Sequence, residues 1–100
     1  MIHVVAIITA KSGMREAILK EFHANMPAVH AEKGCIEYEL YVDAKDDHSC
    51  YLIETWESEA DLDAHKVSEH VSRILPLLGE CRVAKPELLI LKKPEQLSNM

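Results

Sequence analysis

Candidate catalytic side chains gather in one segment of this 100-residue chain, ETWESEADLDAHKVSEH, which runs from Glu54 to His70. It begins with a carboxylate and contains the only Trp of the chain, Trp56, together with His65 and His70. An imidazole takes up or releases a proton near neutral pH, and an indole offers a flat apolar surface. The segment therefore indicates acid/base chemistry beside an aromatic wall, with His65 as the first candidate for the base and His70 as the alternative.

Structural roles compete with this interpretation for each residue. Trp56 could simply be part of the core, and His65 could end a helix by bonding a backbone carbonyl. Glu54 shares a strand face with Trp56, two residues on, and a carboxylate there needs a partner. That partner is either one of the histidines, which would make Glu54 catalytic, or an arginine, Arg73 or Arg82, in a structural ion pair.

The sequence lacks motifs for several other chemistries. The three glycines are isolated, so no phosphate-binding loop is present, and the three cysteines include no C-x-x-C pair. Residues five apart on a straight helix point more than a right angle apart, so His65 and His70 would not share a metal ion unless the chain bends near Ser68. We therefore expect no metal and no cofactor.

Cofactor-independent oxidation fits the residues that remain. Hydroquinones and related polyphenols react with dioxygen once they are deprotonated, so an enzyme must bind the ring, remove a proton and exclude water. Trp56, Tyr38 and Phe22 are the candidate aromatic walls for such a substrate. His65, neutral and partly desolvated over the strand that carries Trp56, would accept the phenolic proton.

The elements that must position these residues alternate along the chain. Strands are expected in HVVAIITA, CIEYELYVD, CYLIETWES and VAKPELLILKK, of which the middle two form a hairpin. A helix is expected from a cap at Ser12 to a C′ residue at Gly34, with a kink or break at Pro27. Further caps at Ser58 and Ser68 predict two short helices that meet between His65 and His70.

This order, βαββαβ, predicts an α+β protein with a ferredoxin-like antiparallel sheet in strand order 4-1-3-2. We expect one domain over residues 1–93 and a C-terminal tail over 94–100. The first, third and fourth strands are apolar on both faces, whereas two helical regions cover only one face of the sheet. Because the other face is apolar and not covered by helices, we expect a homodimer in which a second copy of the chain packs against it.

Composition limits the partners and the location. The formal net charge is -6 and no cluster of Lys and Arg is present, so we expect no nucleic-acid or anionic-membrane partner. The N-terminal run MIHVVAIITAK has no basic leader and too few apolar residues to span a bilayer. The three cysteines are odd in number and widely spaced, which fits a reducing compartment. These features together predict a cytoplasmic protein.

The runs GCIEYELYVD and YLIETWESEADLDAHKVSEH resemble the antibiotic biosynthesis monooxygenase domain, and within it the short quinol monooxygenase-like members. The matching features are the Gly before the second strand with Tyr38 following, the E-x-W-x-S of Glu54 to Ser58, and the histidines His65 and His70. The resemblance extends from about Ile2 to Lys92 and implies a dimeric α+β barrel.

The resemblance leaves two functions open. One is a cofactor-independent monooxygenase of quinols or related polyphenols, and the other is a non-catalytic or isomerase-like dimeric module that binds a small hydrophobic or carbonyl ligand. Haem-degrading members of the family resemble one another in an Asn on the first strand and a Trp and a His in the second helical region. This chain has Thr9 near the first position and no Trp in that region, which argues against haem.

Overall fold

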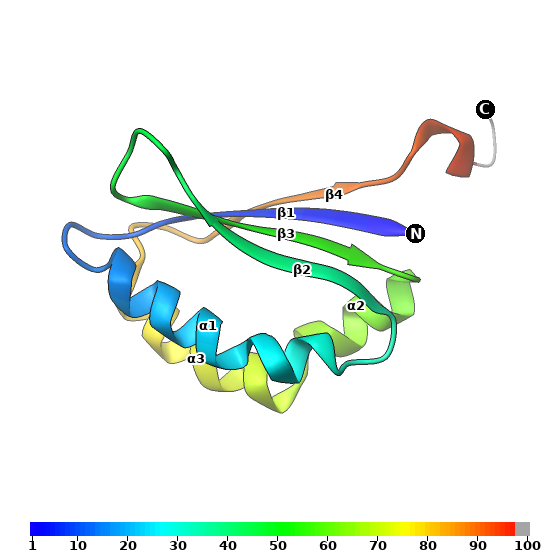
Figure 1. Ribbon diagram of the computed structural model, residues 1–100, viewed down its shortest axis with the longest axis horizontal. Coiled ribbons are helices and arrows are strands. Elements are labelled where there is room, and N and C mark those ends of the chain that lie inside the picture. Colours follow the sequence, from blue (N-terminus) through cyan, green and yellow to red (C-terminus); the bar gives the residue numbers. More distant parts are fainter. Residues whose placement is uncertain (98–100) are drawn as a thin grey trace.

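A four-stranded antiparallel sheet forms one layer of the protein, and helices cover one of its faces (Figure 1). The computed structural model describes residues 1–97. The strands lie in the order β2-β3-β1-β4, which confirms the predicted ferredoxin-like arrangement. Their bounds are β1 (Ile2–Thr9), β2 (Cys35–Val42), β3 (Ser49–Trp56) and β4 (Glu87–Leu91).

The helical layer consists of three α-helices, and a short 3-10 turn follows the last strand. The helices are α1 (Arg15–His30), α2 (Glu59–Lys66) and α3 (Glu69–Cys81), and the turn is η1 (Pro94–Gln96). The turn lies within the predicted tail, whose last three residues are outside the described part. In residues 1–97, no helix combines the length and apolar character needed to cross a bilayer.

The ends of α1 differ from the prediction. Ser12 does not cap the helix, because it lies in a turn with Gly13, which has a φ of 76°, and the helix begins only after Met14. The helix continues through Pro27 to His30 without a break. Pro27 lies in the last turn, where only one helical hydrogen bond is lost.

Gly34 is not the C′ residue of α1, because the C-cap is Ala31. It belongs to the turn before β2 and has a φ of 81°, a left-handed conformation that disfavours other residues. A Cβ at this position would also collide with the side chain of Asp61 in α2. The glycine therefore allows the start of β2 to approach α2 closely.

Both predicted caps of the second helical region are confirmed. The Ser58 hydroxyl accepts a hydrogen bond from the Asp61 amide at the start of α2, and the Ser68 hydroxyl accepts one from the Val71 amide at the start of α3. The Ser68 hydroxyl and amide both donate to the carbonyl of His65. This arrangement ends α2 and starts α3 in a new direction.

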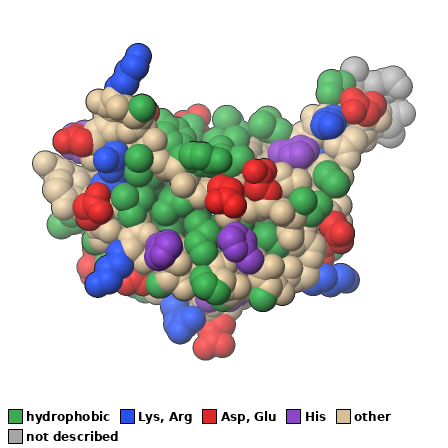
Figure 2. Space-filling view, in the orientation of Figure 1, with side chains coloured by type: hydrophobic (Ala, Val, Ile, Leu, Met, Phe, Trp, Pro, Cys, Tyr) green, Lys and Arg blue, Asp and Glu red, His purple; other side chains and the backbone are tan. Residues whose placement is uncertain are grey.

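The two faces of the sheet have different surroundings. On the face toward the helices, Ala6 of β1 lies between Leu52 and Leu88, and the residues of β1 on this face are buried. On the opposite face, Val5 lies between Ile53 and Leu89 and is only partly covered. Figure 2 shows hydrophobic side chains gathered over the strands on this side, away from the helices. The outer face is therefore apolar and uncovered in the single chain.

Candidate active site

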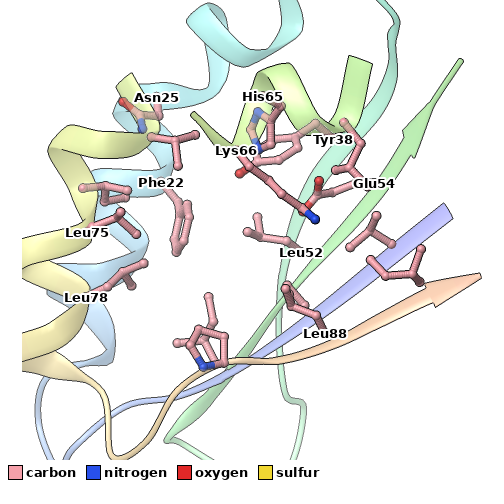
Figure 3. Close-up of a pocket in the computed structure, with 18 residues that line it drawn as sticks. Phe22, Asn25, Tyr38, Leu52, Glu54, His65, Lys66, Leu75, Leu78 and Leu88 are labelled. Carbon is pink, nitrogen blue, oxygen red and sulfur yellow. The ribbon is translucent and has the colours of Figure 1, made fainter. Parts of the chain in front are cut away.

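An apolar cavity of about 230 Å³ lies between the sheet and the helices (Figure 3). Its walls are mainly aliphatic side chains from both layers, among them Val4, Leu52, Leu78 and Leu88. Phe22 of α1, a candidate aromatic wall in the sequence, contributes its ring to the lining of this cavity. A cavity of this kind suits a small hydrophobic ligand.

Four polar side chains gather at one end of this cavity, Tyr38, Glu54, His65 and Lys66, whereas Asn25 lines it from α1 (Figure 3). The four come from β2, β3 and the end of α2, so three separate elements bring them together. A few convergent polar groups in a hydrophobic pocket are what orients a ligand in such sites. Lys66 was not among the residues predicted from the sequence, because its position in the helix looks like that of any exposed lysine.

Both histidines bind one carboxylate, that of Glu32, which was not predicted from the sequence. Its Oε2 atom lies 2.7 Å from Nδ1 of His65 and 2.9 Å from Nε2 of His70. Since an ionised carboxylate only accepts hydrogen bonds, both of these ring nitrogens carry a hydrogen. Glu32 lies in the turn between α1 and β2, and the side chains of the three residues are largely buried.

The bend between α2 and α3 is what brings the two histidines together. Their ring centroids are 6.4 Å apart, a distance that a straight helix would not give for residues five apart. The Ser68 hydroxyl lies 3.3 Å from Nε2 of His70, and Asn25 of α1 donates to the carbonyl of His70. These contacts hold the start of α3 against α1 and His70 beside Glu32.

The imidazole of His65 is enclosed by two aromatic rings. Its centroid lies 4.7 Å from that of Trp56 and 5.5 Å from that of Tyr38, the latter in an edge-to-face arrangement. Trp56 is completely buried and lies behind His65 rather than on the cavity surface. Its role in the site is therefore to support the imidazole, while Tyr38 and Phe22 face the cavity.

The second ring nitrogen of His65 is available to a ligand. Nδ1 is occupied by Glu32, and within residues 1–97 no hydrogen-bond partner contacts Nε2. His65 also lines the cavity, so its ring lies within reach of a group bound there, and a free imidazole nitrogen can accept a proton.

Glu54 has a different partner from those the sequence suggested. Its Oε1 accepts a hydrogen bond of 3.0 Å from the indole of Trp56, and within the described residues neither Arg73 nor Arg82 forms an ion pair with it. Glu54 is 5% exposed, and burial raises the pKa of its carboxyl, although the indole hydrogen bond and His65 act in the opposite direction. The protonated form of this carboxyl is therefore favoured relative to an exposed glutamate.

The phenol of Tyr38 is kept in its neutral form. Burial raises its pKa strongly, and the nearby Glu54 and Glu32 add to the effect. Tyr38 therefore presents a hydroxyl that can donate a hydrogen bond to a ligand oxygen. Together with Nε2 of His65, this places a hydrogen-bond donor and a proton acceptor at the same end of an apolar cavity.

Comparison with protein families gives a match over residues 1–76 to the family described as antibiotic biosynthesis monooxygenase. Among curated proteins, the chain is 35% identical over 81 residues to the probable quinol monooxygenase YgiN of Escherichia coli K12. That alignment covers 71% of this chain and 78% of the relative.

Solved structures show the same fold. PA3566 from Pseudomonas aeruginosa superposes with a TM-score of 0.85 and 32% identity, covering 92% of each chain. A protein from Methanosarcina mazei gives a TM-score of 0.87 and 30% identity over 92% of this chain and 91% of its own. A crystal structure described as an antibiotic biosynthesis monooxygenase superposes with a TM-score of 0.86 and 27% identity. The alignment covers 93% of this chain and 98% of that one.

Proposed function

This chain belongs to the antibiotic biosynthesis monooxygenase family, and from that membership we propose that it oxidises quinols or related polyphenols with dioxygen and without a cofactor. The observation that carries the proposal is the Glu32–His65 pair at the polar end of an apolar cavity. The relative from Escherichia coli, described as a probable quinol monooxygenase, supports the substrate class.

The first step assigned to the site is removal of a phenolic proton. Nε2 of His65 takes the proton, and Glu32 stabilises the imidazolium that forms, because its carboxylate accepts the hydrogen on Nδ1. Trp56 holds the ring in place from behind. The pair works as a carboxylate and a histidine do in other acid/base sites, where the carboxylate both selects the tautomer and stabilises the charge.

The other groups of the cavity bind the substrate and exclude water. Tyr38 can donate to the second oxygen of a quinol, and Phe22 and the aliphatic walls can cover its rings. The resulting electron-rich phenolate is the species that reacts with dioxygen. A dry cavity also limits side reactions of the oxygenated intermediate.

The overall reaction balances without an added reductant. A hydroquinone and one O₂ give one hydroxyquinone and one water, so the ring supplies all four electrons that dioxygen takes up. Two of them come from oxidation of the hydroquinone to the quinone, and two come from formation of the new C–O bond. The protein must therefore contribute only binding and proton transfer.

Oxygen uptake by metal-free protein with a reduced naphthoquinone tests this function. We expect consumption of one O₂ per quinol at a rate clearly above autoxidation, with a hydroxyquinone as the product. A rate equal to that of the buffer alone, at saturating protein and several pH values, would contradict the proposal.

A second candidate function rests on the two proton-transfer groups at one end of the cavity. Glu54, with its raised pKa, can hold a proton, and His65 can accept one, so the pair can move a proton between two positions of a carbonyl ligand. Such an isomerase-like or binding module would bind the quinol or a carbonyl compound saturably and consume no oxygen. Calorimetry of binding alongside oxygen uptake separates the two functions.

We also propose that the protein acts as a homodimer in the cytoplasm. The uncovered apolar face of the sheet, which includes Val5, Ile53 and Leu89, supports a second copy as its partner. The three cysteines are free thiols, two of them buried, which is usual in a reducing compartment. No nucleic acid is expected as a partner, because the net charge is -6.

A further inference from the structure

We propose that Glu32, His65 and His70 form a binding site for a divalent transition-metal ion such as Zn²⁺, and that a metal bound there blocks the base. Binding itself is inferred from the geometry alone, whereas the blocking of the base rests on the proposed function. From the sequence no metal was expected, because the two histidines would point too far apart on a straight helix.

The donor atoms already lie close together. Oε2 of Glu32, Nδ1 of His65 and Nε2 of His70 are all within 4.8 Å of one another. Ligands about 2.0–2.2 Å from a zinc ion stand roughly 3–3.5 Å apart, so the oxygen-to-nitrogen distances of 2.7 and 2.9 Å need only a small expansion. Two imidazoles and a carboxylate are a donor set that zinc and iron both use.

The burial and charge of the surroundings favour the binding of a cation. The side chains of His65, His70 and Glu32 are only 8%, 15% and 15% exposed, so the charge of Glu32 is weakly screened by water. Its negative field reaches Tyr38, Glu54 and Cys35, where it contributes to a raised pKa in each case. Lys66 acts on Glu54 at the cavity end, where its positive charge lowers the pKa of that carboxyl.

The Ser68 hydroxyl completes the immediate surroundings of the site. It lies 3.3 Å from Nε2 of His70 and donates to the carbonyl of His65, so it holds the bend that aligns the two rings. Three protein donors leave a fourth position of a tetrahedral ion for water or another ligand. The site is thus built by a helix break and a turn, and does not depend on a flexible loop.

Metal binding would reverse the role of His65. A neutral imidazole has one N–H, and coordination through Nδ1 moves that hydrogen to Nε2, which has no hydrogen-bond partner within residues 1–97. A ring that accepted a proton from the substrate then presents a donor instead. In each neutral histidine the hydrogen that faced Glu32 moves to the far ring nitrogen without net release of a proton, and the general base is lost while the metal is bound.

Calorimetry with Zn²⁺ on the chelator-treated protein tests the site directly. We expect one ion per chain with a dissociation constant of about 1 µM or lower, and Co²⁺ in its place should give visible absorption bands of a four-coordinate ion. His70→Ala and Glu32→Gln should each weaken zinc binding at least roughly tenfold. Thermal melts of both variants show whether they are folded.

His48→Ala is the matched control for these variants. His48 belongs to an exposed group with Asp46 and Asp47 whose donor atoms also lie close together. Its removal should leave zinc binding unchanged. Binding that disappears with His48→Ala and survives His70→Ala, or the absence of stoichiometric binding at 100 µM Zn²⁺ (about a hundredfold above the expected constant), would overturn the proposal.

Turnover measurements separate this inference from the proposed function. Zn²⁺ should inhibit oxygen uptake at the same concentration at which it binds, and a chelator should restore it. If zinc binds and no quinol is oxidised under any condition, the metal site stands and the proposed function fails. If quinol is oxidised but zinc neither binds nor inhibits, the function stands and the metal site is wrong.

Discussion

Oε2 of Glu32 lies 2.7 Å from Nδ1 of His65, although 33 residues separate the two in the chain. This hydrogen bond fixes which nitrogen of the imidazole carries a hydrogen, and within residues 1–97 it leaves Nε2 without a hydrogen-bond partner on a ring that lines the cavity. It gives the site an oriented base beside an apolar space, so substitutions at either residue should alter proton transfer.

Replacement of His65 tests the base. We expect His65→Ala to lose about a hundredfold or more in turnover of a reduced naphthoquinone, the usual scale for a lost general base, while it stays folded and dimeric. His48→Ala, in an exposed turn, should change almost nothing. If the His65 variant kept full activity with the same pH profile, the proton would have to be taken by another group, with His70 as the next candidate.

Replacement of Glu32 tests the positioning of that base. Glu32→Gln removes the negative charge that stabilises the imidazolium, so kcat should fall by about ten- to a hundredfold. The acid limb of the pH–rate profile should move to lower pH, and the KM for the quinol should change much less, because Glu32 does not line the cavity. Glu32→Asp should recover part of the rate. A higher KM with an unchanged kcat would show that Glu32 acts on substrate binding instead.

Glu54 makes a prediction about stability and pH. Its carboxyl has a pKa raised above 4.5, chiefly by burial, so the folded protein keeps a proton in a pH range where the unfolded chain has lost it. The folded state then binds more protons than the unfolded state, and stability falls as pH rises through that range from 4.5 upward. Above the raised pKa the stability contributed by this proton is completely lost.

Glu54→Gln should remove this dependence, because the amide is neutral at every pH. The Tm of the variant should approach or exceed that of the wild type as pH rises from about 4 toward neutrality, and thermal melts across this range measure the difference. Other titrating groups are common to both proteins and cancel in the comparison. Parallel Tm curves would show that the ionised carboxylate is fully compensated in the native state.

The outer face of the sheet predicts the assembly. Light scattering at micromolar concentration should give about twice the chain mass of 11.3 kDa, as expected for a large apolar interface. Ile53→Asp should split or unfold the dimer, since it places an unpaired charge among Val5 and its neighbours. Val67→Asp, the same kind of change at a position 78% exposed at the end of α2, should remain dimeric. A monodisperse wild-type monomer would contradict the proposal.

The order of the elements and the break between the last two helices could be predicted from the sequence. Alternating apolar residues and the caps at Ser58 and Ser68 are local signals, each present in residues within about four positions of one another. The same locality explains the errors at Ser12 and Gly34. There the turn conformation of Gly13 and the contact with Asp61 determine the backbone, and neither is encoded in the helical periodicity.

The construction of the site depends on contacts that form only in the folded chain. His65, Tyr38 and Phe22 were recognisable as candidates by their type, but Glu32 looks like any charged residue of a turn, and its partners lie 33 and 38 residues away. Trp56 was recognisable as important, yet its place behind His65 depends on how α2 packs over β3. A side chain acquires its chemical role from neighbours that folding brings together, and sequence spacing carries no record of contacts across separate elements.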